Sequence, residues 1–291
     1  MTATLGSNAP EQPAAVPTHA QVRRWPTIPS ISVVIPALNE EENLPQVFGT
    51  IPQALLDAEG CTVEVIVVDN LSHDRTAEVA AGLGARVVLQ AARGYGNAYH
   101  AGFAHARGEV IVTGDADCTY PFDAIPDLLD VLSRRGLDFL NTNRLLPANR
   151  SAMKPSHTLG NRVLTATSRS LFPGPFRDSQ SGMWVFHRRI WSHLDVRSGG
   201  MAFSQEIKNE AWLKGFRCAE VPIEYRKRGG VVKLNALRDG TRNVSQLAAH
   251  RMRADRRQTV VRVLRRHDHT AATPTASEFP LPVDAPRPAA H

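Results

Sequence analysis

Short runs of β-branched and other apolar residues alternate with segments of helical periodicity through the first half of the chain. This alternation constrains the fold most, because strands that are apolar on both sides need helices on both faces of their sheet. The predicted strands are Ile31–Pro36, Val63–Val68, Arg86–Leu89, Val110–Thr113 and Asp138–Leu140. The sequence therefore predicts an α/β fold with a Rossmann-like, mostly parallel sheet flanked by helices on both faces.

Helices are expected between these strands. One set of apolar residues recurs at helical spacing: Leu44, Val47, Phe48, Ile51 and Leu55. Pro52 lies inside this pattern and predicts a break in the helix. Further helices are predicted over Thr76–Ala81, around Ala98–His105 and around Ile125–Leu132. Ligands of such folds bind beyond the carboxyl ends of the strands, so the polar residues there are candidate site residues.

Composition excludes some classes of protein. No run approaches the roughly 18 apolar residues of a membrane span, and the N-terminal region lacks the apolar core of a signal peptide. The three cysteines, Cys61, Cys118 and Cys218, show no metal-site spacing, so we expect reduced thiols in a cytoplasmic protein. A net charge of +6 favours anionic partners such as nucleotides or phospholipids.

Two aspartates, Asp115 and Asp117, directly follow the strand Val110–Thr113. Alternate carboxylates of a turning segment can point to the same side, and two hard oxygen ligands suit Mg²⁺ or Mn²⁺. The pair therefore predicts a metal site that neutralises a leaving diphosphate. A solvated turn is the alternative.

Two other strand ends carry candidate ligand contacts. Asp69 can hydrogen-bond a ribose or a base, whereas Ser72 or Asp74 can cap the next helix. Gly94 and Gly96 allow close approach of the backbone to a ligand, with a plain loop as the alternative. They do not form a dinucleotide fingerprint, because Tyr99 occupies the position of the third glycine.

An ordered set of motifs resembles the family-2 glycosyltransferases of the GT-A fold. The motifs are I-S-V-V-I-P-A-L-N-E, V-V-D-N-x-S-x-D-x-T, G-x-G-x-A and D-A-D, followed by the segments 178–182 and 229–235. Within the family, the chain is most similar to the dolichyl- and polyprenyl-phosphate sugar synthases, over about residues 31–245. The resemblance implies an inverting, metal-dependent hexosyltransferase that uses a UDP- or GDP-sugar.

The resemblance also implies roles for individual residues. Those assigned to the nucleotide sugar are Pro36, Ala37, Asn39, Glu40, Asp69, Gly94, Gly96 and Asp115. Asp115 and Asp117 would hold Mg²⁺ or Mn²⁺. The candidate phosphate contacts are Arg144, Arg177, Arg226 and Lys233. Three positions depart from the pattern of the synthases: Asn70 replaces an aspartate, Tyr95 a lysine, and Thr119 a glutamine.

The same reading divides the chain into domains. Residues 1–29 and 270–291 are rich in proline and alanine and are expected to be a disordered leader and tail. Residues 30–245 would form the GT-A domain, with a nucleotide-binding half over about 30–120 and an acceptor half over about 121–245. Residues 246–269 would form a basic helix.

The acceptor is expected to be a polyprenyl phosphate. A hydroxyl acceptor needs a general base, for which Asp178 and Glu206 are the catalytic candidates beside Asp117. A phosphate acceptor already carries about 1.5–2 negative charges and needs cations instead. A soluble enzyme acting on a hydroxyl of a saccharide, metabolite or natural product is the alternative.

Two surfaces favour a peripheral position at the cytoplasmic face of a membrane. Apolar residues within Arg144–Phe176 could meet an isoprenoid chain or simply pack on the core. The arginine-rich segment that begins at Arg251 could lie on anionic lipid or be solvated. A nucleic-acid partner is not expected, because only 6% of the residues are aromatic and able to stack on bases.

Overall fold

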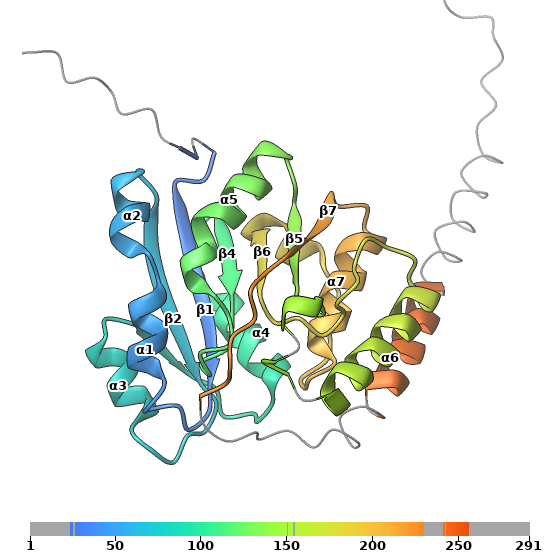
Figure 1. Ribbon diagram of the computed structural model, residues 1–291, viewed down its shortest axis with the longest axis horizontal. Helices are drawn as coiled ribbons and strands as arrows, with labels where there is room; N and C mark the ends of the chain where they lie inside the picture. Colours follow the sequence, from blue (N-terminus) through green and yellow to red (C-terminus); the bar gives the residue numbers. More distant parts are fainter. Residues whose placement is uncertain are drawn as a thin grey trace, which may run out of the picture.

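The computed structural model describes residues 24–25, 27–149, 151–153, 155–229, 241 and 243–255. Within these residues, seven strands form one sheet in the order β3-β2-β1-β4-β6-β5-β7 (Figure 1). The strands are β1 Ser30–Ala37, β2 Thr62–Asp69, β3 Arg86–Leu89, β4 Val110–Thr113, β5 Phe139–Asn143, β6 Trp184–His187 and β7 Cys218–Pro222. Strand β6 runs antiparallel to β4 and β5, while every other neighbouring pair is parallel. The predicted α/β fold with a mostly parallel sheet is confirmed.

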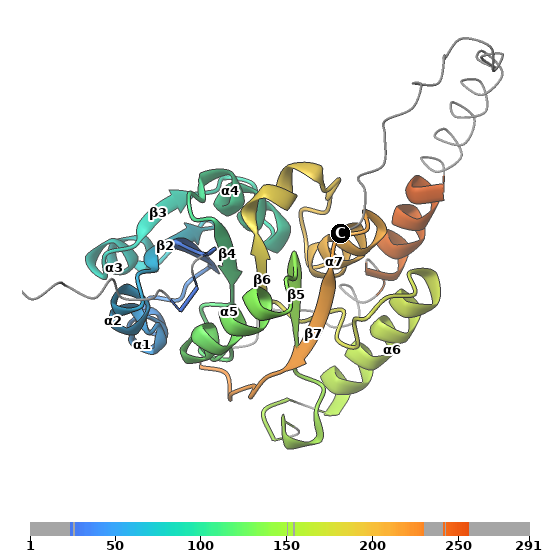
Figure 2. The same cartoon turned by 90° about the horizontal axis from the view of Figure 1, so that it is seen from above.

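Helices cover both faces of the sheet (Figure 2). The α-helices are α1 Leu44–Thr50, α2 Gln53–Ala58, α3 Thr76–Gly82, α4 Tyr95–His105, α5 Ile125–Arg134, α6 Pro155–Leu171 and α7 Phe203–Leu213. Short 3-10 helices span Phe122–Ala124, Pro147–Asn149 and Arg188–His193. Helices α1, α2, α3 and α5 contribute to the core on one face, and α4 and α7 to the core on the other.

The local sequence explains several boundaries. The alternate residues of β1 enter opposite cores, Val33 and Ile35 on one face and Val34 on the other, which is why the strand has no polar side. Helix α1 ends before Pro52 and α2 begins after it, so the predicted break is confirmed.

Ordered structure begins before the expected domain boundary at residue 30. Trp25 and Ile28 are buried in the core, and Trp25 Nε1 donates a hydrogen bond of 2.6 Å to Asp130. Arg24 pairs with the same carboxylate at 2.6 Å. The expectation that the leader is disordered as far as residue 29 is therefore wrong for these residues, because two large apolar side chains find partners beside α5.

A helix over residues 243–255 packs against α7 and begins before the expected position 246. Its inner face contains Leu247, His250 and Ala254, all of them buried. The rest of the expected basic helix, residues 256–269, and the expected tail lie outside the described residues. In the part of the chain that is described, no helix combines the length and the apolar character needed to cross a membrane.

Candidate active site

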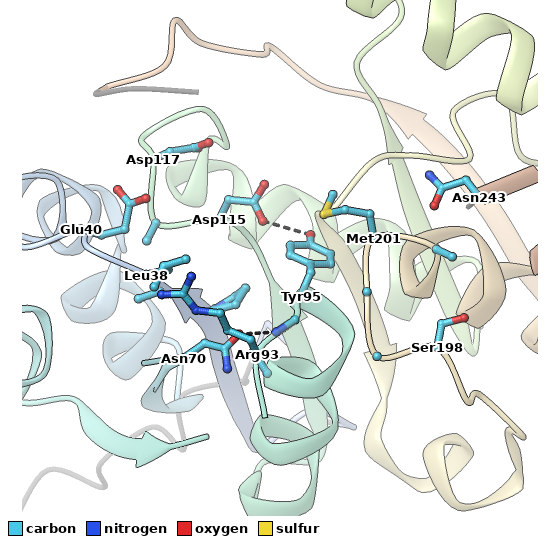
Figure 3. A pocket seen from close by; sticks show the side chains of 18 of the residues that line it. Leu38, Glu40, Asn70, Arg93, Tyr95, Asp115, Asp117, Ser198, Met201 and Asn243 are labelled. Atoms are coloured by element: carbon cyan, nitrogen blue, oxygen red, sulfur yellow. Dashed lines mark hydrogen bonds between the residues drawn. The ribbon is translucent and has the colours of Figure 1, made fainter. Parts of the chain in front are cut away.

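A cavity of about 590 Å³ opens at the carboxyl ends of β1, β2 and β4 (Figure 3). The end of β1 and the loop after it supply one wall, with Pro36, Ala37, Leu38 and Glu40. Asn70 follows β2 and lines the same side. This is the edge of the sheet where ligands of parallel α/β folds bind.

The three loops that leave these strands each contain a non-glycine residue with left-handed backbone. The φ angles are 52° at Asn39, 65° at Leu71 and 64° at Cys118. Left-handed backbone is costly for such residues, above all for leucine, and tends to be kept at functional sites. The strain therefore marks the same edge of the sheet as the cavity does.

Two residues expected to contact the nucleoside hydrogen-bond to the loop after β2 instead. Asn39 is exposed and does not line the cavity, and its Oδ1 accepts a hydrogen bond of 2.8 Å from the backbone of His73. Asp69 is buried and accepts a hydrogen bond of 3.1 Å from Ser72 N. Asn70 lines the cavity in place of Asp69. The side-chain alternation of a strand, which sends neighbouring residues to opposite sides, accounts for this one-residue difference.

Asp117 lies in the lining of the cavity and is only 3% exposed. Its Oδ1 accepts hydrogen bonds from Thr119 N at 3.2 Å and from Thr119 Oγ1 at 2.5 Å. Its Oδ2 forms an ion pair of 2.6 Å with Arg228 Nη2. Although burial opposes it, the charge of Asp117 raises the pKa of Arg228, so this arginine stays cationic.

Asp115 lines the cavity beside Asp117 and accepts a hydrogen bond of 3.0 Å from the Tyr95 hydroxyl. Burial and the charge of Asp117 raise the pKa of the Asp115 carboxyl to about 7. Nearby positive charge favours the anionic form of Asp115, as the charge of Arg228 already does, and a bound divalent cation would favour it further. Carboxylate oxygens suit Mg²⁺ or Mn²⁺, so the two aspartates fit the expected metal.

The glycines of the Gly94-Tyr95-Gly96 segment serve different purposes. Gly94 lines the cavity, has a φ of 139° that favours glycine, and donates a hydrogen bond of 2.7 Å to Asn70 Oδ1. Gly96 does not line the cavity, and a Cβ there would lie 2.1 Å from the backbone oxygen of Ser198. The expectation that Gly96 approaches the nucleotide sugar is not supported, because Gly96 instead allows close packing of the loop 198–202, which follows the 3-10 helix Arg188–His193.

The loop 198–202 and the helix over 243–255 form the far wall of the cavity, opposite Leu38 and Asn70 (Figure 3). Met201 comes from the loop, and Asn243 and Gln246 come from the helix. The far wall was not predicted, since a single helical turn of polar residues gives no distinctive sequence pattern.

Glu206, a candidate general base, holds this far wall together rather than facing the cavity. It is fully buried in α7, and its Oε2 accepts hydrogen bonds from Arg197 N at 3.1 Å and Ser198 N at 2.8 Å. Its Oε1 pairs with Arg253 of the helix over 243–255. A carboxylate committed to these partners is not supported as a base.

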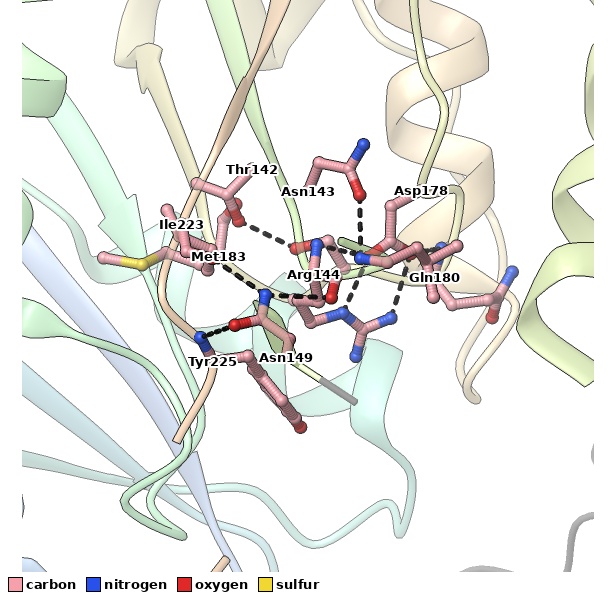
Figure 4. A network of polar contacts seen from close by, with 12 residues as sticks. Thr142, Asn143, Arg144, Asn149, Asp178, Gln180, Met183, Ile223 and Tyr225 are labelled. Carbon is pink, nitrogen blue, oxygen red and sulfur yellow. Dashed lines mark hydrogen bonds and ion pairs between the residues drawn. The ribbon is translucent and has the colours of Figure 1, made fainter. Parts of the chain in front are cut away.

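Asp178, the other candidate base, is also fully buried and lies outside the lining of the cavity (Figure 4). It forms a two-point ion pair with Arg144, with 2.8 Å from Nε to Oδ2 and 3.0 Å from Nη2 to Oδ1. Arg144, expected to bind phosphate, is thereby occupied. Neither residue is placed for its expected role, because each neutralises the other inside the protein.

Two further expected phosphate contacts, Arg177 and Arg226, do not line the cavity. Arg177 is exposed, and Arg226 pairs with Asp123 at 2.8 Å. Lys233 lies outside the described residues. The described chain instead places Arg93 and Arg228 in the lining. One signal in the sequence could have identified Arg228. It directly precedes the segment 229–235, which is one of the segments that resemble the family.

The chain is similar to a family of known proteins. The model of the family described as Glycosyl transferase family 2 matches residues 32–194, which are more than half of the chain and include Asp115 and Asp117. The chain belongs to glycosyl transferase family 2. The family expected from the motifs is therefore confirmed.

Two archaeal relatives come from Haloferax volcanii. The low-salt glycan biosynthesis hexosyltransferase Agl6 is 39% identical over 221 residues, covering 74% of this chain and 52% of the relative. A dolichyl-phosphate hexose transferase is 31% identical over 214 residues, covering 74% of this chain and 90% of the relative. The family 2 glycosyltransferase thus spans about half the length of Agl6 but nearly all of the second relative.

Solved structures show the fold. Glucosyl-3-phosphoglycerate synthase from Mycobacterium tuberculosis, with Mn²⁺, uridine diphosphate and glucosyl-3-phosphoglycerate bound, has a TM-score of 0.61 and 24% identity, covering 76% of this chain and 79% of its own. Mannosyl-3-phosphoglycerate synthase from Rubrobacter xylanophilus has a TM-score of 0.57 and 21% identity, covering 86% and 78%. The expected GT-A fold is confirmed.

Proposed function

We propose that this enzyme transfers a hexosyl group from a UDP- or GDP-sugar to a polyprenyl phosphate, with inversion and with Mg²⁺ or Mn²⁺ held by Asp115 and Asp117. The observation that carries the proposal is the placement of these two aspartates between two walls of one cavity of about 590 Å³. A cavity of this size accommodates a small-molecule substrate such as a nucleotide sugar.

The near wall would bind the nucleoside. Pro36 to Leu38 and Asn70 offer backbone and amide groups for hydrogen bonds, and Arg93 lies beside them. Arg228 would exchange Asp117 for an oxygen of the diphosphate, because a guanidinium forms charge-assisted hydrogen bonds with either partner. When bound, the metal would neutralise the negative charge that develops on the leaving diphosphate.

The state of the two buried acids favours a phosphate acceptor. Both Asp178 and Glu206 have their oxygens engaged inside the protein, away from the lining of the cavity. A hydroxyl acceptor would need a base to remove its proton, whereas a phosphate oxygen arrives already charged. The name of the relative that is 31% identical, a dolichyl-phosphate hexose transferase, supports the same acceptor.

Helix α6 supports a peripheral position at a cytoplasmic membrane face, where a polyprenyl phosphate would be met. Its outer side exposes Leu159 and Val163, which are 65% and 55% exposed. The exposed Arg162 and Arg169 lie on the same helix. An apolar stripe flanked by cations is the arrangement that binds the surface of an anionic membrane.

The test is a transfer assay with purified enzyme, Mn²⁺ or Mg²⁺, and UDP- or GDP-linked glucose, mannose or galactose. Undecaprenyl and dolichyl phosphates serve as lipid acceptors, and a panel of saccharides serves as hydroxyl acceptors. We expect a lipid-linked hexose, detected by mass spectrometry, that disappears when Asp117 is replaced by Ala or when EDTA is added. Transfer to a saccharide alone would refute the lipid-phosphate acceptor, and hydrolysis without any transfer would refute both.

A further inference from the structure

Two amide atoms in the far wall have no partner among the described residues. Asn243 Oδ1 and Gln246 Nε2 are both inaccessible to solvent, and no described atom hydrogen-bonds to either of them. Both residues line the cavity, and Asn243 as a whole is only 4% exposed. Buried polar atoms of folded proteins are paired in the great majority of cases, so two unpaired atoms on residues that line one cavity need an explanation.

The rest of each amide is fixed by hydrogen bonds, which settles which atom of each amide is unpaired. Asn243 Nδ2 donates to Gln180 Oε1 at 3.1 Å, which leaves its Oδ1 free. Gln246 Oε1 accepts from Gln205 Nε2 at 3.0 Å, which leaves its Nε2 free. Gln205 Nε2 also donates to the backbone oxygen of Asn243 at 2.7 Å. The lining of the cavity therefore contains one unpaired acceptor and one unpaired donor from the same helical turn.

Chemistry and position together indicate the ligand group. A neutral donor and a neutral acceptor match hydroxyl groups, which can both donate and accept, whereas a phosphate would need cations. Asn243 lies across the cavity from Leu38 and Asn70, with Asp115 between the two sides (Figure 3). A nucleotide sugar with its nucleoside on the near wall and its diphosphate at the aspartates would extend its sugar towards the far wall.

We propose that Asn243 and Gln246 form a hydroxyl-binding subsite for the hexosyl group of the donor. This inference rests on the proposed nucleotide-sugar site. Glu206 and Gln205 act as positioning residues for the subsite, because they tie α7 to the helix over 243–255. The polyprenyl part of the proposed acceptor carries no hydroxyl groups, so the hydroxyls that the subsite recognises are those of the donor sugar.

The test compares nucleotide sugars with the nucleotides alone. Dissociation constants for UDP, GDP and their glucose, mannose and galactose derivatives are measured by calorimetry with Mn²⁺ present. For Gln246→Ala and Asn243→Ala, we expect binding of the favoured nucleotide sugar to weaken roughly 5- to 10-fold, as for the loss of one hydrogen bond. Binding of the corresponding nucleoside diphosphate should stay unchanged.

Two further variants keep the result decisive. Gln246→Glu retains an oxygen that accepts from Gln205 and replaces the free donor by a carboxylate oxygen, so it should lower the ratio of sugar-nucleotide to nucleotide affinity as well. Val244→Ala, on the exposed side of the same turn, should leave that ratio unchanged. An unchanged ratio in all the Asn243 and Gln246 variants would overturn the subsite alone. Failure of the wild type to bind either nucleotide would overturn the proposed function with it.

Discussion

Asp117 is held at both oxygens of its carboxylate, by Thr119 at Oδ1 and by Arg228 at Oδ2. A divalent cation that binds Asp117 must therefore displace or rearrange a cation of the protein itself. Arg228 stabilises the carboxylate when no ligand is present and becomes available to a phosphate once it is released. In the proposed function, Arg228 thus links binding of the metal to binding of the diphosphate.

Removing the guanidinium of Arg228 should strengthen the binding of Mn²⁺ and weaken the binding of the nucleoside diphosphate. For Arg228→Gln, we expect Mn²⁺ alone to bind several-fold more tightly and the nucleoside diphosphate to bind about tenfold more weakly, because a charge-assisted hydrogen bond is lost. Electron paramagnetic resonance measures the first constant and calorimetry the second. Arg226→Gln is the matched control, since Arg226 pairs with Asp123 outside the cavity. Equal Mn²⁺ affinity in the wild type and Arg228→Gln would contradict the competition.

The buried pair of Asp178 and Arg144 makes a prediction about stability. Asp178→Asn would leave the guanidinium of Arg144 buried without a negative partner, and breaking such a pair costs about 3–5 kcal/mol of unfolding free energy. Urea denaturation measures the loss. Asp123→Asn, at an exposed ion pair, should lose less than about 1 kcal/mol. Similar losses in the two variants would show that the buried pair has no special role.

The ion pair of Asp178 and Arg144 should also make the free energy of unfolding depend on pH. Although burial opposes it, Arg144 lowers the pKa of Asp178 below its ordinary value of 3.8. The unfolded chain therefore takes up this proton first as the pH falls, so the contribution to stability is complete above pH 3.8 and is lost below it. We expect the free energy of unfolding of Asp178→Asn to decline less steeply below pH 3.8 than that of the wild type. Parallel curves in denaturant titrations at each pH would contradict this.

At the level of residues, the sequence indicated the loops that line the cavity more often than the side chains that do so. Asp115 and Asp117 were singled out from their type and spacing, and both line the cavity. Asn70 and Arg228 were missed in favour of Asp69 and Arg226, their near neighbours. Which of two nearby polar residues faces a cavity depends on the local backbone direction, and composition does not show it.

At the level of elements, the strands and helices of the first half were predictable because their apolar residues recur with clear periods. Helix α7 was not, because its buried residues include Gln205, Glu206, Lys208 and Glu210, which form no apolar stripe. The ammonium of Lys208, for example, donates to the backbone oxygens of residues 178, 179 and 181 at 2.8–3.1 Å. Tertiary partners, rather than periodicity, explain the burial of this helix.

Gly96, at the start of α4, packs closely against the loop 198–202, and this contact can be tested. Gly96→Ala would place a Cβ against the backbone of Ser198 and push the loop 198–202 away, which should destabilise the fold by about 1–3 kcal/mol and weaken nucleotide-sugar binding. Gly49→Ala is the control, because nothing lies within 4 Å of its Cβ and alanine favours helix α1 by up to about 1 kcal/mol. Thermal unfolding and calorimetry measure the two effects. A Gly96→Ala protein as stable as Gly49→Ala would refute the contact.

At the level of the whole molecule, the proposed membrane contact of α6 lies near one edge of the sheet and leaves the other edge free of it. Strand β3 forms one edge, while α6 lies towards the opposite edge near β7 (Figure 1). If α6 contacts a membrane, the protein should bind vesicles through one end only. The cavity opens between these two ends, at the carboxyl ends of β1, β2 and β4.

Vesicle binding tests this asymmetry. We expect the wild type to sediment with vesicles that contain phosphatidylglycerol at low salt and to be released at high salt, because surface charge is screened. Replacing both Leu159 and Val163 by Ser should reduce the bound fraction several-fold. Leu89→Ser in β3, where the leucine is 74% exposed, is the control and should bind as the wild type does. Equal binding by both variants would exclude α6 as the contact.

The anchoring of the helix over 243–255 to α7 also bears on how the chain folds during synthesis. Glu206 and Glu210 are buried in α7, and their partners Arg253 and His250 come some forty residues later in the sequence. Until the ribosome has released that helix, two carboxylates lack these partners. The matched family region, residues 32–194, leaves the exit tunnel well before this point. The nascent enzyme should therefore reach its final stability only after Arg253 has left the ribosome.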